Sequence, residues 1–151
     1  MSDAPILICY DCSEPARRAI LVAAAILGPR PAIVLDVGPL FTPAESYALA
    51  ASAASAVEFE HAHAGEALTR AGEGADMARA AGFTARPRGA VAAPTWMGIL
   101  DVAEESGASG IVIGSHGRTG VHQFVEGSVS HEVAKHSAVP VLIVPPQTRR
   151  H

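Results

Sequence analysis

The fold of this chain is decided by residues 111–120, which read Ile-Val-Ile-Gly-Ser-His-Gly-Arg-Thr-Gly. The three apolar residues at the start form a short continuous run, typical of a strand that is covered on both faces. A polar, glycine-rich loop follows, and the chain then reads Gly-Ser-Val-Ser at residues 127–130. Because glycine lacks a Cβ, such a loop can adopt positive φ and bring its N–H groups close to an anion. Ser128 can cap a following helix whose N-terminus favours negative charge, so the pattern indicates phosphate-binding chemistry.

The glycine spacing is more specific than the glycine content. Two residues separate Gly114 from Gly117, and nine separate Gly117 from the pair Gly127 and Ser128, which gives G-x2-G-x9-G-[ST]. This spacing resembles the nucleotide-binding signature of the universal stress protein family, in its ATP-binding branch. The run Val-Pro-Val-Leu-Ile-Val at residues 139–144 resembles the family as well. The alternative is a structural turn in an α/β domain that binds nothing, since a motif match remains a hypothesis.

The composition is that of one domain with a substantial core. The chain has 151 residues, of which 49% are hydrophobic, and this is too short for two ordinary domains. A formal net charge of −4, with no basic patch apart from Arg149 and Arg150, argues against a nucleic-acid or membrane partner. Neither a signal peptide nor an apolar stretch long enough to span a bilayer is evident. We therefore expect a cytoplasmic protein with one domain at residues 1–146 and a disordered tail at 147–151.

Five strand-like runs alternate with helical segments. They cover residues 5–10, 31–37, 83–91, 111–113 and 139–144. Such alternation predicts an α/β fold, in which a parallel sheet carries helices on both faces. Pro87 has no N–H for a strand ladder, so the run at 83–91 is expected at an edge. The family resemblance implies the strand order 3-2-1-4-5, a Rossmann-like arrangement of the adenine nucleotide alpha hydrolase type.

Residues 42–81 are rich in alanine and are expected to be largely helical. Glycines at positions 65, 72 and 74 predict at least one break, with a separate helix at about residues 43–63 as a candidate lid or partner surface. The second part should turn the residues at 68, 71, 75 and 78 toward the sheet. His61 and His63 do not share a helical face, so we expect surface histidines rather than metal ligands.

Asp11 follows the first strand and leaves two alternatives. It can help to cap the helix that begins after Ser13, or it can face a ligand at the carboxyl end of the strand. Its position favours the second alternative. Cys9 and Cys12 form a C-x-x-C pair. Residues three apart on a strand point to opposite faces, so neither a disulfide nor a redox pair is expected.

The resemblance implies an ATP site in the crevice between the first and fourth strands. The implied site residues are Asp11, Val37, Ile113, Gly114, Gly117, Arg118, Gly127, Ser128 and Val129. ATP is the implied cofactor, with Mg²⁺ or Mn²⁺ as candidate metal ions whose ligands are unknown. The family also implies a homodimer through residues 139–144, since an apolar edge strand exposes unpaired backbone groups.

Three functions are compatible with these residues. The first is an ATP-binding stress-response or signalling module, the second a nucleotide-free dimeric scaffold, and the third a slow ATP hydrolase. Hydrolysis needs a placed base or water-orienting group, for which Asp11, His116 and Arg118 are the candidates, and they form no recognisable catalytic arrangement. The retained glycines favour nucleotide binding over the scaffold.

Overall fold

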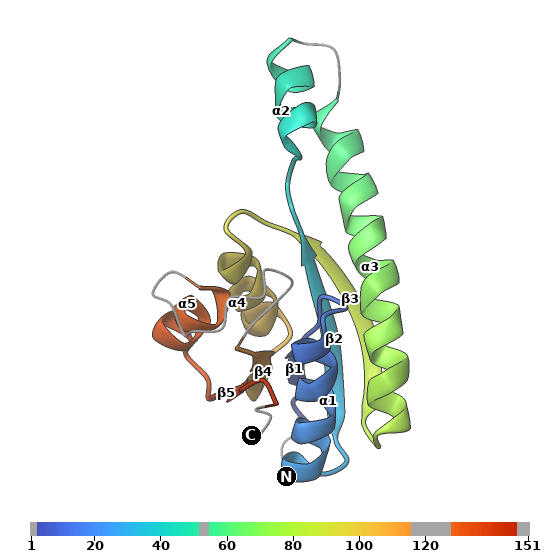
Figure 1. The fold of residues 1–151 in the computed structure, drawn as a ribbon, viewed down its shortest axis with the longest axis vertical. Coiled ribbons are helices and arrows are strands. Elements are labelled where there is room, and N and C mark those ends of the chain that lie inside the picture. The colour runs from blue at the N-terminus through green and yellow to red at the C-terminus, as the bar shows by residue number, and fades with distance from the viewer. Residues whose placement is uncertain (1–2, 52–54, 116–127, 148–151) are drawn as a thin grey trace.

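Five parallel strands form one sheet in the order β3-β2-β1-β4-β5, which confirms the predicted fold class. The computed structural model describes residues 3–51, 55–115 and 128–147 (Figure 1). The strands are β1 (Ile6–Cys9), β2 (Pro31–Gly38), β3 (Thr84–Val91), β4 (Gly110–Gly114) and β5 (Val141–Val144). The helices are α1 (Glu14–Leu27), α2 (Pro43–Ala50), α3 (Ala56–Ala80), α4 (Thr95–Glu105) and α5 (Val129–His136). None of these helices is both long and apolar enough to cross a membrane.

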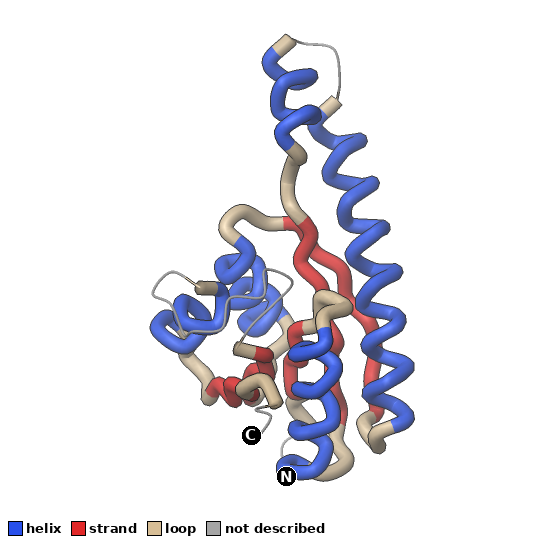
Figure 2. Tube along the Cα trace, in the orientation of Figure 1, coloured by secondary structure: helices blue, strands red, loops and turns tan. Residues whose placement is uncertain are grey.

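Helices cover both faces of the sheet, as Figure 2 shows. Alternate residues of β1 belong to two apolar clusters, one on each face of the sheet. Ile6 and Ile8 pack with α1 and α3, whereas Leu7 and Cys9 pack with α4 and α5. Cys12 packs against the first cluster, and both thiols are free. The two cysteines of the C-x-x-C pair therefore lie toward opposite faces, as the strand geometry predicted.

Local signals set the ends of the first helix. The Ser13 side chain accepts a hydrogen bond from the N–H of Ala16, at 3.3 Å, and so caps α1. Gly28 ends the helix with φ of 70°, a conformation that favours glycine. Both residues were expected at these positions.

Helix α3 runs without a break over 25 residues, which corrects the expectation of a break at its glycines. A Cβ on Gly74 would lie 2.7 Å from the Tyr10 ring, so this glycine lets the ring pack under the helix. Gly72 has nothing within 4 Å of its Cβ position. A helix tolerates such glycines at about 1 kcal/mol each when tertiary packing stabilises it.

The outward orientation of Leu68 is a second correction, because this side chain was expected to face the sheet and is 48% exposed. Gly89 of β3 explains the difference: a Cβ there would lie 2.5 Å from the backbone nitrogen of Leu68. The α3 backbone thus lies directly on β3, with the Leu68 side chain directed away. Ala67 and Ala71 are buried instead.

Helix α2 and the first turns of α3 project beyond the sheet, on the side of the carboxyl end of β2 (Figure 1). A separate helix was expected in this part of the chain, and α2 is that helix, although it ends at Ala50 rather than near residue 63. His63 belongs to α3 and is buried, at 8% exposed, so its assignment as a surface histidine was wrong.

Candidate functional site

The switch point of the sheet lies between β1 and β4. These strands are neighbours, with Leu7 opposite Ile111, and the chain leaves β1 toward β2 on the other side. Asp11 follows β1, and Ser115 follows β4, so both lie at the same edge of the sheet. Ligands of open α/β sheets bind at such an edge.

Asp11 has a local structural partner at this edge. Its Oδ1 accepts a hydrogen bond from the backbone N–H of Ser13, at 3.0 Å, in the turn that leads into α1. The side chain therefore supports the start of the helix, which is the first of the two alternatives left open by the sequence. Asp11 is partly buried.

Gly114 is favoured by packing as well as by position. It is the last residue of β4, and a Cβ there would lie 3.0 Å from the carbonyl oxygen of Pro15 in the first turn of α1. A side chain at position 114 would push α1 away from the sheet. The glycine thus has a structural reason that holds with or without a ligand. The preceding Ile113 is 6% exposed and faces the core, which leaves only its backbone for a ligand.

Ser128 caps α5, as predicted. Its Oγ accepts a hydrogen bond from the N–H of His131, at 3.2 Å. Val129 begins the helix and is 37% exposed. Ser130, the second residue of α5, donates to the carbonyl oxygen of Ser115 at 3.5 Å, which ties the start of α5 to the end of β4.

The Ser115 hydroxyl is the unusual polar group of this edge. Its Oγ is buried and has no hydrogen-bond partner among the described residues, although its N–H bonds the Val144 carbonyl at 3.0 Å. A buried hydroxyl without a partner costs free energy, so an atom in this position suits a polar ligand or the adjoining loop. Gly117, Arg118 and Gly127, which were also expected to form the site, lie outside the described residues.

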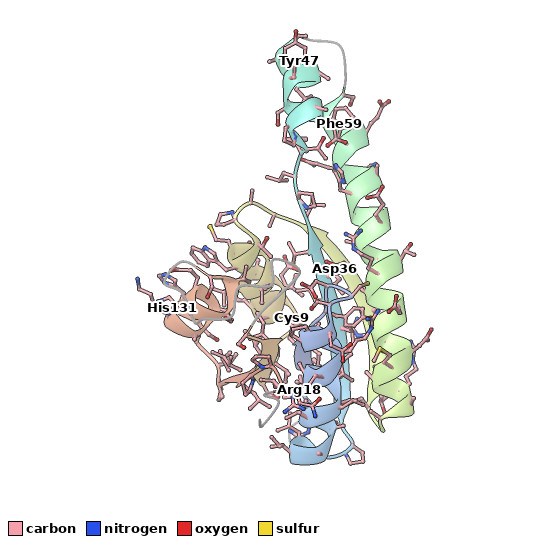
Figure 3. The ribbon with its side chains drawn as sticks, in the orientation of Figure 1. Cys9, Arg18, Asp36, Tyr47, Phe59 and His131 are labelled. Atoms are coloured by element: carbon pink, nitrogen blue, oxygen red, sulfur yellow. The ribbon has the colours of Figure 1, made fainter. Side chains whose placement is uncertain are left out.

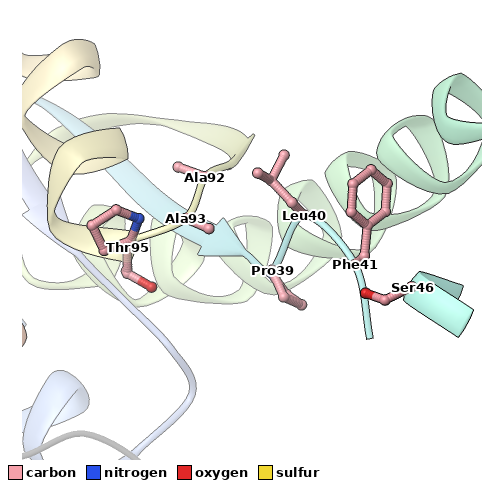
Figure 4. Close-up of a pocket in the computed structure, with 8 residues that line it drawn as sticks. Pro39, Leu40, Phe41, Ser46, Ala92, Ala93 and Thr95 are labelled. Atoms are coloured by element: carbon pink, nitrogen blue, oxygen red, sulfur yellow. The ribbon is translucent and has the colours of Figure 1, made fainter. Parts of the chain in front are cut away.

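A pocket of about 400 Å³ opens beside the end of β2 (Figure 4). It is lined by residues 39–41 and Ser46 on one side and by residues 92–95 on the other. Val37 is partly buried and lies close to this lining, since a Cβ on Gly98 would lie 3.1 Å from the Val37 side chain and 2.6 Å from that of Ala92. The volume falls within the range of about 300–1,000 Å³ that small-molecule sites occupy. The lining is mostly apolar, which suits a flat organic group better than a phosphate.

A second polar cluster, formed by Tyr10, Arg17 and Glu73, had no signal in the sequence. Tyr10 donates from its hydroxyl to Glu73 Oε1 at 2.5 Å, and Arg17 contacts the same oxygen at 3.1 Å. Burial, and then the Glu73 contact, raise the pKa of Tyr10, whereas the Tyr10 and Arg17 contacts lower the pKa of Glu73. Burial also raises the pKa of the Cys9 thiol to about 12, which makes it unreactive. The contacts among Tyr10, Glu73 and Arg17 join the end of β1 to α3 and α1.

Asp36 is a further residue that sequence reasoning missed, because it was assigned to a buried strand without a role. It belongs to β2 (Figure 3), is 2% exposed, and pairs with Arg70 of α3. A charged residue inside an otherwise apolar strand was the available signal, since buried charges need partners. Among the described residues no group of three or more His, Cys, Asp or Glu side chains could hold a metal ion.

Comparison with known proteins identifies the family of this chain. The model of the universal stress protein family matches residues 4–145. Universal stress protein YxiE of Bacillus subtilis is 52% identical over 46 residues, which are 30% of this chain and 31% of that protein, so the chain matches less than a third of its length.

Two solved structures share the fold over nearly the whole chain. Protein MJ0577 is 24% identical with a TM-score of 0.72, covering 99% of this chain and 100% of that one. A universal stress protein in complex with cAMP is 25% identical with a TM-score of 0.61, covering 93% and 95%. Because the family model spans nearly all of the sequence, this chain belongs to the universal stress protein family.

Proposed function

We propose that this protein is an adenine-nucleotide-binding module of stress response or signalling, with ATP as the expected nucleotide. The observation that carries the proposal is the apolar pocket of about 400 Å³ beside Val37, at the carboxyl edge of the sheet. A relative whose structure contains cAMP supports the choice of an adenine nucleotide. An adenine ring needs an apolar slot with a few polar groups at its rim, and this pocket offers both.

The phosphates would lie toward the β4–α5 end of the same edge. Ser128 caps α5 there, and the helix N-terminus favours negative charge. The buried Ser115 hydroxyl and the G-x2-G-x9-G-[ST] spacing add hydrogen-bond donors of the type that phosphates require. Any Mg²⁺ or Mn²⁺ would be held mainly by the nucleotide phosphates, as magnesium usually is in nucleotide sites.

The nucleotide-free scaffold remains the second candidate, and one observation favours it. Gly114 is explained by its contact with Pro15, and Asp11 by its bond to Ser13. Two of the expected site residues therefore have structural roles that a protein without a ligand would also need.

In either case we propose a homodimer built on β5. The strand lies at the edge of the sheet, and three of its four residues are only partly buried. Such an apolar edge exposes unpaired backbone groups, which pairing with a second copy across a two-fold axis would satisfy.

Titration calorimetry of purified protein tests the nucleotide proposal. Ala93 is exposed and lines the pocket, so Ala93→Tyr should fill the pocket and weaken both ATP and adenosine binding, by about tenfold or more for a loss near 1.4 kcal/mol. Gly127→Val should weaken ATP and leave adenosine binding unchanged. Ala25→Tyr, on the exposed side of α1, is the matched control. Absence of ATP, adenosine and cAMP binding in the folded wild type would reject this function in favour of the scaffold.

A further inference from the structure

Helix α2 has little packing of its own. It spans eight residues and buries none of them. Its N-terminus is stabilised by a capping box, in which Thr42 accepts from the N–H of Glu45 at 3.2 Å and Glu45 accepts from the N–H of Thr42 at 2.7 Å. A helix of this length is marginal in water, so its position depends on contacts with the rest of the protein.

One ionisable pair joins α2 to α3. Oε2 of Glu45 lies 2.7 Å from Nε2 of His63, and the histidine is 8% exposed. The Phe41 and Phe59 rings meet edge to face beside this pair, with centroids 6.4 Å apart. Figure 3 shows Phe59 on α3 close to the base of α2. Glu45 thus serves the cap of its own helix and the contact with α3 at once.

The charges around His63 come from two elements. Glu45 approaches from α2, and Glu66, on α3 itself, lies 3.7 Å from Nδ1. From β2, Gly38 packs against the backbone carbonyl of His63. The contact with Glu45 raises the pKa of His63 despite its burial, and Glu66 adds to the rise. The pKa of Glu45 is lowered, first by the Thr42 backbone and then by His63.

The same part of the chain forms a wall of the pocket. Residues 39–41, which lead into α2, and Ser46 within it face residues 92–95 across the opening (Figure 4). Movement of α2 would therefore change the shape of the pocket.

We propose that the Glu45–His63 pair is a proton-controlled latch that holds α2 on α3 and thereby fixes one wall of the pocket. Protonated His63 makes a charge-assisted bond to Glu45, which is stronger than a neutral one. When His63 loses its proton, the charge–charge attraction is lost and at most a hydrogen bond from a neutral imidazole N–H remains. The contact is then weaker, and α2 opens more often.

The pH window follows from the two shifts. The pKa of His63 is raised in the folded state. The stabilisation that protonated His63 gives to the closed position of α2 is therefore complete below the usual histidine pKa of about 6.5, and it is lost as pH rises through the raised pKa. Glu45 has a lowered pKa, so it stays ionised until the solution is more acidic than its usual range. The latch is closed between these limits and opens on the alkaline side.

Hydrogen exchange of the α2 amides, corrected for intrinsic rates and measured without nucleotide, tests the latch directly. Protection at about pH 6 should exceed protection at about pH 8.5 by roughly two- to fivefold, the range for partly exposed ion pairs. Glu45→Gln should abolish this difference, since glutamine keeps the capping box and removes the charge. Glu66→Gln, at a side chain that is 64% exposed, is the matched control and should keep most of the difference in protection between the two pH values. The NMR pKa of His63 should fall in Glu45→Gln.

Equal protection of α2 at both pH values, or an equal loss in Glu45→Gln and Glu66→Gln, would overturn the latch. Its effect on ligands rests on the proposed function: ATP should bind more weakly at about pH 8.5 than at about pH 6, and this difference should vanish in Glu45→Gln. A pH-dependent α2 in a protein that binds no nucleotide would reject the proposed function and leave the latch standing.

Discussion

Arg70 of α3 pairs through Nε with Oδ2 of Asp36 in β2, inside the layer between helix and sheet. The Asp36 side chain is 2% exposed and that of Arg70 is 27% exposed, so the carboxylate depends on this helix for its compensating charge. Asp36 directly precedes Val37, which lies beside the pocket. The pair therefore links the position of α3 to the end of β2.

Removal of the arginine should destabilise the fold strongly. In Arg70→Met the buried carboxylate loses its cation, and breaking a buried pair typically costs about 3 kcal/mol or more. Arg88→Gln removes an exposed partner of Glu105 and should cost less than about 1 kcal/mol. Urea denaturation at neutral pH measures the free energy of unfolding of both variants. Equal stability of the two variants would show that Asp36 does not depend on Arg70.

The glycines of α3 should respond in opposite directions. Gly74→Ala places a methyl group 2.7 Å from the Tyr10 ring and should destabilise by about 1–3 kcal/mol through overpacking. Gly72→Ala meets nothing within 4 Å and should stabilise by about 0.5–1 kcal/mol, because alanine favours the helix. Thermal or urea unfolding of the two variants decides the matter, and a stabilising Gly74→Ala would contradict the packing described.

Acid should remove the contribution of Glu73 to the stability of the fold. Its pKa is lowered by Tyr10 and then by Arg17, so the stabilisation is complete above the usual glutamate range and is lost as pH falls through the lowered pKa. The wild type should exceed Glu73→Gln in stability near neutral pH, and the two should converge in acid. Unfolding midpoints across a pH series provide the measurement. A gap that persists at the acid end would assign the effect to packing.

The edge strand β5 should control assembly. We expect the wild type to sediment as a dimer at tens of micromolar, roughly where weak association is visible. Leu142→Asp should yield a monomer or insoluble protein, because it places a charge within the proposed interface. Leu21→Asp, on an exposed position of α1, should leave the dimer intact. A monomeric wild type under these conditions would mean that β5 is covered in another way.

Sequence by itself determined the elements whose signals are local. Apolar runs marked the strands, Ser13 and Ser128 marked helix starts through their caps, and Pro87 marked an edge strand because it lacks an N–H. The glycine spacing pointed to the family, and with it to the strand order that the structure confirms.

Tertiary structure decided the features of a residue that depend on a neighbour distant in sequence, such as its burial and its contacts. Gly74 lies within an unbroken α3, where it packs on the Tyr10 ring, and His63 is buried in contact with Glu45 of α2. Gly114 is close to α1 as well as to the expected ligand position, a contact that spacing along the chain cannot reveal. Burial and pairing are properties of atoms brought together by folding, so only the folded chain assigns them.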